Sequence, residues 1–215
     1  MPSPSGIVAA VVLAAGKSGR MGENKLLLPW KNKPLLVHSV ETALHVSPPH
    51  SVDVVVGCDS PRVVEALERH FGTPLPFSTV HNPDWSHGQS TSLRRGLASA
   101  LSRPDTESID AVMFVLGDQP LIRADTLDRL IAAHRAAAST GTHPATAPTY
   151  QNRRGNPAIL SRTLFPRIEE LRGDTGARGI LDSLGDTLLL VPVDDPGIHR
   201  DIDTREAYDR LCRGG

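Results

Sequence analysis

A glycine-rich loop with spaced cations follows the first apolar stretch of the chain. Residues 7–13 are all apolar, and residues 14–25 then read Ala-Ala-Gly-Lys-Ser-Gly-Arg-Met-Gly-Glu-Asn-Lys. Glycines let backbone N–H groups approach phosphate oxygens, and cationic side chains neutralise phosphate charge. We expect Arg20 and Lys25 to hold a triphosphate from two sides, whereas Lys17 is equally well placed to face water.

This loop fits neither of two common phosphate motifs. A P-loop needs a glycine five residues before Gly16, and that position is Val11. The spacing of Gly16, Gly19 and Gly22 also differs from the dinucleotide fingerprint. The structural alternative is a tight turn with solvated cations. The position of the loop after the most apolar stretch, and its continuation into Lys25, favour the phosphate site.

A candidate metal ligand ends a second apolar stretch. Residues 111–116 are apolar and run into Gly-Asp-Gln-Pro at 117–120. Magnesium with phosphate is usually held by one or two carboxylates and several waters, and Asp118 is our first ligand. The alternative is an Asx turn or a helix cap. Arg123 and Asp125 are better placed to begin the next helix. Asp118 is therefore not needed as a cap and is available as a metal ligand.

The second carboxylate is expected from residues 201–204, which read Asp-Ile-Asp-Thr. In an extended segment both aspartates face the same side, so either can reach a metal. We prefer Asp201 as the metal ligand and place Asp203 in a supporting or helix-capping role. Thr204 is the other candidate for the cap of the final helix.

Three further polar segments could contact the substrates. Residues 81–94 are dense in hydrogen-bonding groups, and a helix start there can read a base edge or bind an anion. The alternative is a polar loop with Ser90 as its N-cap. Residues 153–157 and 173–178 each join glycine to arginine, which suits either an anionic acceptor or a surface turn. The aspartates at 194 and 195 resemble ordinary turn residues.

Alternating strands and helices must position these groups. Expected strands are 7–14, 52–57, 78–81, 109–116, 145–148, 158–160 and 187–193. Expected helices are 34–44, 61–71, 90–101, 124–138, 161–171, 177–184 and 205–212. The alternation predicts a mostly parallel sheet with helices on both faces. Ligands bind beyond the carboxyl ends of such strands, so loops 14–25, 83–92 and 117–120 should converge there.

Composition restricts the classes of function. The 215 residues suit one domain, which we place at 1–215, and 39 % hydrophobic residues with 4 % aromatics suit a core of aliphatic side chains. A net charge of −1 argues against a dedicated nucleic-acid binder. The two cysteines have no zinc spacing. No apolar stretch approaches the ~20 residues of a membrane span, and no secretory signal is evident, so we expect a cytoplasmic protein.

Taken together, the segments resemble the MobA-like nucleotidyltransferases, most closely their molybdenum cofactor cytidylyltransferase branch. The matching segments are LAAGKSGRMGENKLLLPW (13–30), HNPDWSHGQSTSLRRGL (81–97), LGDQP (116–120), RGNPAIL (154–160), GDTGARGIL (173–181) and DIDT (201–204). They follow the family order and span nearly the whole chain. The LAAG sequence with a later arginine and lysine is shared by all sugar-nucleotide-type pyrophosphorylases.

The resemblance implies a Rossmann-like sheet of about seven strands with one reversed. It implies that Mg²⁺ or Mn²⁺ is held by Asp118 with Asp201 or Asp203, and that Arg20, Lys25 and Asp118 are catalytic. The residues implied to bind the nucleotide are Leu13, Ala14, Ala15, Gly16, Lys17, Ser18, Gly19, Arg20, Met21, Gly22, Lys25, Asn82, Gly88, Ser90, Ser92 and Gly117.

The resemblance also implies the reaction. CMP passes from CTP to a phosphorylated acceptor such as molybdopterin, and a molybdoenzyme or its chaperone is a candidate partner. Ala15 favours CTP, because the guanylyl-transferring branch has glycine at this position. Asn156 departs from the histidine common in its motif, which leaves the acceptor open. An in-line attack on the α-phosphorus needs no covalent intermediate, so positioning and charge neutralisation suffice.

Two alternatives remain open. The first is a nucleotidyltransferase that uses another NTP such as GTP, or another acceptor such as a sugar phosphate, a polyol phosphate or phospholactate. The second is a nucleotide-binding chaperone that delivers a cofactor without catalysis. In that case nucleotide binds but no pyrophosphate is released.

Overall fold

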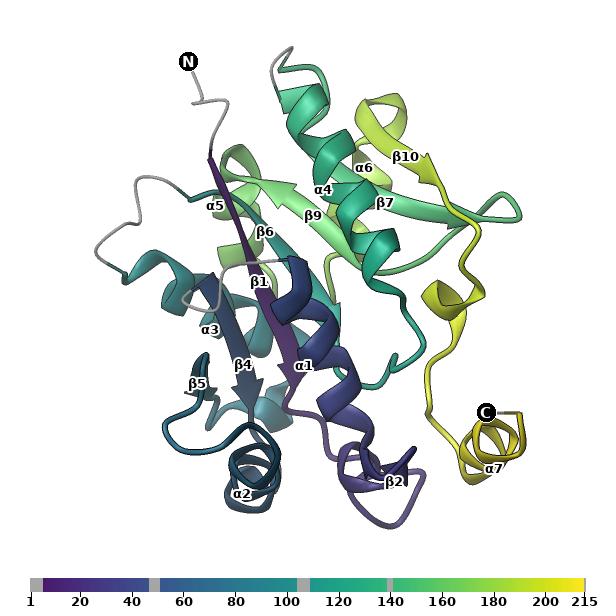
Figure 1. Cartoon of the computed structure of the whole chain (residues 1–215). Coiled ribbons are helices and arrows are strands. Elements are labelled where there is room, and N and C mark those ends of the chain that lie inside the picture. The colour runs from purple at the N-terminus through teal and green to yellow at the C-terminus, as the bar shows by residue number, and fades with distance from the viewer. Residues whose placement is uncertain (1–5, 47–50, 104–108, 139–140, 215) are drawn as a thin grey trace.

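One eight-stranded sheet with helices on both faces forms the centre of the molecule (Figure 1). The computed structural model describes residues 6–46, 51–103, 109–138 and 141–214. The strands of the sheet are β1 Ile7–Ala14, β4 Val52–Val56, β5 Ser78–His81, β6 Ile109–Leu116, β7 Ala145–Tyr150, β8 Arg153–Arg154, β9 Ala158–Ser161 and β10 Leu188–Pro192. A separate two-stranded hairpin comprises β2 Pro29–Trp30 and β3 Lys33–Pro34.

The sheet has the topology expected from the sequence. Its order is β10-β7-β9-β6-β1-β4-β5, and β8 pairs with β7 at one end. Strand β9 runs antiparallel to both of its neighbours, while the other pairs along this path are parallel. The predicted mostly parallel sheet of about seven strands with one reversed strand is therefore confirmed, and the short β8 adds an eighth.

Strand β1 is apolar throughout because both of its faces are covered. Val8, Ala10 and Val12 belong to one buried cluster, whereas Ala9 and Val11 belong to another on the opposite face. A parallel strand between two helical layers has this character, unlike a strand with one wet face. The central position of β1, between β6 and β4, brings the loop that follows it to the middle of the sheet edge.

The helices divide into two layers. The first cluster includes side chains of α1, α2 and α4, and the second includes those of α3, α5 and α6. Their bounds are α1 Leu35–Val46, α2 Ser60–Phe71, α3 Gln89–Leu101, α4 Ala124–Ala138, α5 Phe165–Glu169 and α6 Arg178–Ser183. Short 3₁₀ helices occupy Lys25–Leu27, Trp85–His87, Arg162–Leu164, Gly185–Thr187 and Pro196–His199. Within the described ranges, the helices are too short or too polar to cross a bilayer.

Two expectations for the C-terminal part were wrong. The predicted helix 161–171 is a 3₁₀ turn followed by the five-residue α5, because Ser161 still belongs to β9 and donates its N–H to Pro144. Asp195 is not an ordinary turn residue, since it is 2 % exposed. Its carboxylate accepts from the N–H groups of Arg123 and Gly197 and from the Thr126 hydroxyl, and so fixes the start of α4.

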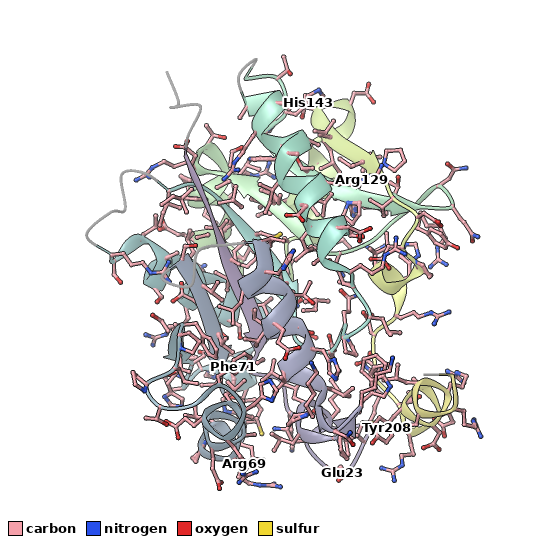
Figure 2. All side chains as sticks on the ribbon, in the orientation of Figure 1. Glu23, Arg69, Phe71, Arg129, His143 and Tyr208 are labelled. Atoms are coloured by element: carbon pink, nitrogen blue, oxygen red, sulfur yellow. The ribbon has the colours of Figure 1, made fainter. Side chains whose placement is uncertain are left out.

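The last helix, α7 Arg205–Arg213, is fastened to the N-terminal third of the chain. The Tyr208 hydroxyl donates to the carbonyl of Pro29 at 2.6 Å, and Arg205 pairs with Glu23 at 2.9 Å. In Figure 2 the labelled Glu23 and Tyr208 lie at the same end of the molecule. This docking brings residues 201–204 beside the loop that follows β6.

A buried histidine makes stability depend on pH. His134 of α4 is 3 % exposed and hydrogen-bonds with the hydroxyls of Thr146 and Ser161. Burial, and then the charge of Arg135, lower the pKa of His134 from 6.5 to about 4. Because the unfolded chain binds this proton at a higher pH than the folded chain, stability is full above pH 6.5 and is lost as pH falls towards 4.

His134→Gln is therefore expected to flatten this acid dependence. The wild-type free energy of unfolding should fall by on the order of 3 kcal/mol more than that of the variant between neutral pH and pH 4. Urea unfolding at a series of pH values measures the free energy of unfolding of the wild type and of the variant. Parallel pH profiles for the two proteins would contradict a neutral, buried His134.

Candidate active site

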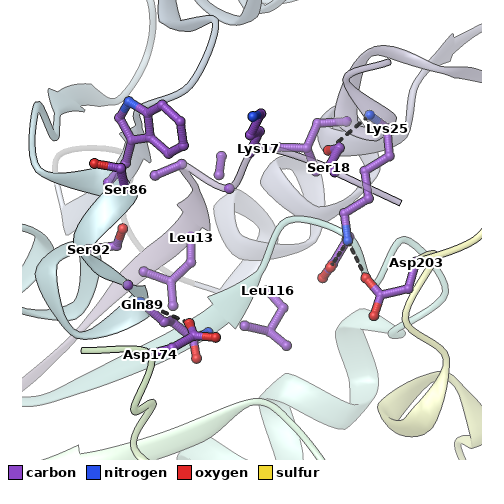
Figure 3. A pocket seen from close by; sticks show the side chains of 18 of the residues that line it. Leu13, Lys17, Ser18, Lys25, Ser86, Gln89, Ser92, Leu116, Asp174 and Asp203 are labelled. Atoms are coloured by element: carbon purple, nitrogen blue, oxygen red, sulfur yellow. Dashed lines mark hydrogen bonds and ion pairs between the residues drawn. The ribbon is translucent and has the colours of Figure 1, made fainter. Parts of the chain in front are cut away.

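A pocket of about 790 Å³ opens where the loops after β1, β5 and β6 meet (Figure 3). Residues 13–20 line its floor, with Lys25 and Asp203 at one end. Gln89 and Asp174 lie at the other end, and Figure 3 shows Lys25 extending towards Asp203, away from them. The three loops predicted to converge do so, and a fourth and a fifth segment, around Asp174 and Asp203, join them.

The loop after β1 is held by its own serine. Ser18 adopts a φ of 56°, its carbonyl accepts from the N–H of Met21, and its hydroxyl accepts from the N–H of Lys25. A Cβ built at Gly16 or Gly19 would meet no atom within 4 Å. The backbone at these two glycines is therefore open to the pocket rather than filled by packing.

One ammonium group lies between two carboxylates at the charged end. Lys25 Nζ is 2.5 Å from Asp118 Oδ2 and 2.5 Å from Asp203 Oδ1. Arg20 reaches the other oxygen of Asp203 at 3.0 Å. The Lys25 side chain is 12 % exposed, whereas that of Arg20 is 72 % exposed. Lys25 is therefore the buried cation of this cluster, and Arg20 is the exposed one.

The charges within the cluster stabilise one another. Burial lowers the pKa of Lys25, but the Asp118 carboxylate, followed by Asp203, outweighs burial and raises that pKa above its ordinary value. Burial raises the pKa of Asp203, yet Lys25 and then Arg20 bring it below its ordinary value. Both groups are therefore charged at neutral pH.

Residues 201–204 are arranged differently from our expectation. Asp203, not Asp201, lines the pocket, and Asp201 turns away to accept from the side-chain amide of Gln119 at 2.5 Å. Thr204 caps α7 by accepting from the N–H of Ala207. The N–H of Ile202 donates to the carbonyl of Asp118, which aligns the two segments. The expected order of preference between the two aspartates is reversed by this geometry.

The loop after β5 is organised by a buried amide. Asn82 is fully buried and donates to the hydroxyls of Thr91 and Ser92, while its carbonyl oxygen accepts from the N–H of Asp84. Asn82 therefore shapes this loop and does not line the pocket, where sequence reasoning had expected a nucleotide contact. Ser92, held by that amide, does line it.

Ser90 is not the N-cap expected from the sequence. Helix α3 begins at Gln89, with Gly88 as its N-cap. Ser90 is fully buried, its hydroxyl has no hydrogen-bond partner within the described ranges, and it lies outside the pocket lining. The N–H groups at this helix start are already used by the Asp174 carboxylate and the Gly173 carbonyl, so they are not open to an anion as expected.

Three other predicted nucleotide-binding residues also lie outside the pocket lining. Met21 packs with the small apolar cluster around Trp30. Gly22 has a φ of +72°, which suits the turn that leads to Lys25. Gly117 donates its N–H to the carbonyl of Leu13, and a Cβ at Gly117 would lie 2.9 Å from that oxygen. A glycine is therefore needed where the chain leaves the end of β6 close to β1.

Sequence reasoning missed several residues that line the pocket. Trp85 and Gln89 lie within the polar segment 81–94, but no pattern singled them out. Asp174 follows the glycine of a segment that had been considered for the acceptor. Asp174 contacts α3 at residue 89, and this contact between distant parts of the chain cannot be predicted from the sequence pattern. The pocket residues not named in advance are Leu26, Trp85, Ser86, His87, Gln89, Leu116 and Asp174.

The basic segment 153–157 is largely occupied by internal contacts. Arg154 pairs with Asp182 at 2.6 Å, and a Cβ at Gly155 would meet the Ile198 carbonyl at 2.6 Å. Neither residue lines the pocket. The structure therefore does not bring this segment to the charged cluster, and its expected contact with an anionic acceptor stays a prediction.

Gly88 has no room for a side chain. Its φ is +105°, and a Cβ there would lie 2.2 Å from the backbone of Gly173. Gly88→Ala is expected to destabilise the protein by about 2 kcal/mol or more and to weaken nucleotide binding, because α3 and residues 173–174 must separate. Gly179→Ala is the matched control, since that helical glycine has nothing within 4 Å of its Cβ position. Thermal unfolding compares the stability of the two variants. Equal stability would contradict the close contact between Gly88 and the backbone of Gly173.

Comparison with known proteins assigns the chain to a family. Residues 10–188 match the family described as the MobA-like NTP transferase domain. The purine catabolism protein PucB of Bacillus subtilis is 35 % identical over 214 residues, covering 94 % of this chain and 95 % of PucB. The nicotine blue oxidoreductase of Paenarthrobacter nicotinovorans is 30 % identical over 207 residues, covering 95 % and 96 %.

Solved structures agree with this assignment. The Rv0371c protein of Mycobacterium tuberculosis superposes with a TM-score of 0.79 at 26 % identity, covering 97 % of this chain and 98 % of that one. A manganese complex of the same protein has a TM-score of 0.77 at 25 % identity, covering 97 % and 100 %. Fold and family together define a nucleotidyltransferase. The chain belongs to the MobA-like NTP transferase family.

Proposed function

We propose that this enzyme transfers CMP from CTP to a phosphorylated acceptor, molybdopterin, and releases pyrophosphate. The observation that carries the proposal is the cluster of Lys25, Asp118, Asp203 and Arg20 at one end of a pocket at the carboxyl edge of the sheet. Cations there can receive phosphate oxygens, and the carboxylates can hold a divalent ion. The whole chain, residues 1–215, acts in this proposal as one catalytic domain.

The donor set fits a divalent metal ion. Two carboxylates from different segments already lie on either side of a single cation, Lys25. No group of three or more His, Cys, Asp or Glu side chains able to hold a metal occurs among residues 6–46, 51–103, 109–138 and 141–214. A pair of carboxylates is the arrangement that Mg²⁺ uses when substrate phosphates and waters complete its coordination. Asp118 and Asp203 would hold Mg²⁺ or Mn²⁺, which when bound neutralises charge on the phosphates.

The side chains of the pocket would act by position and charge. An acceptor phosphate oxygen attacks the α-phosphorus, the bond to the bridging oxygen of the β-phosphate breaks, and pyrophosphate leaves with that electron pair. Lys25 and the exposed Arg20 would stabilise the growing negative charge on the leaving group. The open backbone at Gly16 and Gly19 would approach the phosphates closely.

The other end of the pocket would receive the base. Trp85, Ser92 and Ala15 line it, and Cys58 donates its N–H to the Ala15 carbonyl. The Ala15 methyl packs against Gly57, so the preference for CTP rests on the resemblance, in which the guanylyl-transferring branch has glycine at this position. The name of the Paenarthrobacter relative describes oxidoreductase chemistry, whereas the cations and carboxylates in this pocket favour nucleotidyl transfer.

A substrate panel tests the proposal. Purified enzyme with Mg²⁺, molybdopterin and each of CTP, GTP, ATP and UTP is assayed for pyrophosphate, and thermal shifts record which nucleotide binds. We expect the fastest release with CTP. Fastest release with GTP would overturn the base assignment, and turnover only with a sugar phosphate, a polyol phosphate or phospholactate would overturn the acceptor. Nucleotide binding without any pyrophosphate would favour the delivery chaperone.

A further inference from the structure

A second hollow of about 750 Å³ lies on the other side of the segment that carries the pocket aspartate. Asp203 lines the nucleotide pocket, whereas Asp201 and Ile202 line this second cavity. The cavity is bounded by the β2–β3 hairpin and by helix α7. Its volume is comparable with that of the nucleotide pocket, so it can accommodate a small molecule.

The second cavity is strongly basic although the chain is not. Four cationic side chains line it, Lys31, Arg200, Arg210 and Arg213, and Asp201 is the one carboxylate among its lining residues. The whole chain carries a net charge of −1. The carboxylate is moreover already hydrogen-bonded by Gln119. The cavity therefore has an excess of positive charge that the rest of the protein does not share.

The guanidinium groups of this cavity have few partners. Among the described residues, the side chains of Arg200, Arg210 and Arg213 form no hydrogen bond or close ion pair, and the exposed Glu206 on the same helix is the acidic group that feels the charge of Arg210. Arginines elsewhere are paired, as Arg103 is with Asp53 at 2.6 Å and Arg205 is with Glu23 at 2.9 Å. Three unpaired guanidinium groups around one hollow present many N–H donors in the geometry that suits phosphate.

The remainder of the wall is apolar. Trp30 is 9 % exposed and belongs with Ile202 and Leu211 to one small buried cluster, against which Leu121 packs. Lys31 lies over the Trp30 ring at 4.8 Å. A ligand for this cavity would therefore combine a phosphate group with an apolar or planar body.

We propose that this second cavity is a binding site for a phosphorylated small molecule, separate from the nucleotide pocket. Arg200, Arg210 and Arg213 bind the phosphate, and the wall of Trp30, Leu121 and Ile202 receives the body of the ligand. Because the N–H of Ile202 donates to the Asp118 carbonyl, a bound ligand contacts the segment that positions both pocket carboxylates.

The two tryptophans allow a direct test, since Trp30 lines the second cavity and Trp85 the nucleotide pocket. In a Trp85→Phe background, Trp30 is the single reporter. The probe is inorganic pyrophosphate with EDTA present, titrated to millimolar concentration. We expect a saturable change in Trp30 fluorescence, and Arg210→Ala/Arg213→Ala in this background should weaken the binding at least about tenfold.

Arg135→Ala is the matched control, because that exposed arginine of α4 lines neither pocket. It should leave the binding unchanged. Calorimetry on the protein with both tryptophans provides a second measurement, in which the Arg210→Ala/Arg213→Ala variant should lose one of the pyrophosphate sites. No saturable change together with no calorimetric difference between wild type and this variant would overturn the proposal. Equal weakening by Arg135→Ala would also overturn it, since the effect would then be one of general charge.

Discussion

Asp118→Asn is expected to lower kcat by about 10²-fold or more while the protein remains folded. Asp118 lies at the carboxyl end of a buried strand and contacts Lys25, so its charge both holds this lysine and would bind the metal. Asparagine keeps the shape of the side chain and removes the charge. Losing one preorganised electrostatic group in an active site commonly costs this much. Steady-state pyrophosphate release at saturating nucleotide measures it.

Asp125→Asn is the matched control for the Asp118 variant. Asp125 is an exposed aspartate in the first turn of α4 and lies outside the pocket. It should retain wild-type turnover. Near-normal turnover in Asp118→Asn, with its thermal stability unchanged, would show that this carboxylate is not part of the reaction.

Lys25→Met is expected to separate the two roles of the lysine. Without nucleotide, the ammonium lies between Asp118 and Asp203 and neutralises them. Methionine keeps the length of the side chain without its charge, so the carboxylates would attract a divalent ion more strongly. Mn²⁺ affinity in the absence of nucleotide should rise at least about tenfold, because the interaction of a charge with two half-buried carboxylates is worth about 1.4 kcal/mol or more. Turnover should fall by about 10²-fold or more, because a cation facing the phosphates is lost.

Titration with Mn²⁺, followed by electron paramagnetic resonance, measures the first effect without any reliance on activity. Lys33→Met is the matched control, since Lys33 pairs with Glu41 and lies outside the pocket that Lys25 lines. It should change neither quantity. If Lys25→Met bound Mn²⁺ no more tightly than wild type, the lysine would not compete for the carboxylates, and the proposed metal site would need another location.

The meeting of Lys25 and Asp118 could be predicted from sequence because it follows from the sheet. Strands β1 and β6 are apolar on both faces, which predicts central positions, and the structure places them next to each other. Their carboxyl ends then lie side by side, and groups 93 positions apart come within hydrogen-bond distance. Apolar patterning and chain direction predicted that these loops meet at one edge of the sheet, and the family resemblance indicated which side chains meet there.

The choice between Asp201 and Asp203 could not be made in this way. Residues 201–204 form no strand, so alternation does not govern which side chain faces the pocket. Gln119 binds Asp201 and thereby leaves Asp203 for Lys25. That outcome depends on contacts between residues about 80 positions apart, which the sequence pattern does not contain.

Buried polar groups explain the other differences. Asn82 was expected to contact the nucleotide because it lies in a polar segment, yet it is fully buried and used by the loop itself. The sequence predicts a turn residue at Asp195, yet its carboxylate caps a helix that begins about 70 positions earlier. A polar residue whose partners are distant looks in sequence like an exposed one, and only the fold distinguishes them.

A crystal structure with Mn²⁺ and a non-hydrolysable CTP analogue tests the central claim most directly. The anomalous signal of manganese locates the ion without reference to any assumed chemistry. We predict one peak within coordination distance of Asp118 and Asp203, with Lys25 and Arg20 on the phosphates and the base beside Trp85 and Ser92. Manganese away from Asp118, or a triphosphate that contacts neither Arg20 nor Lys25, would contradict the account.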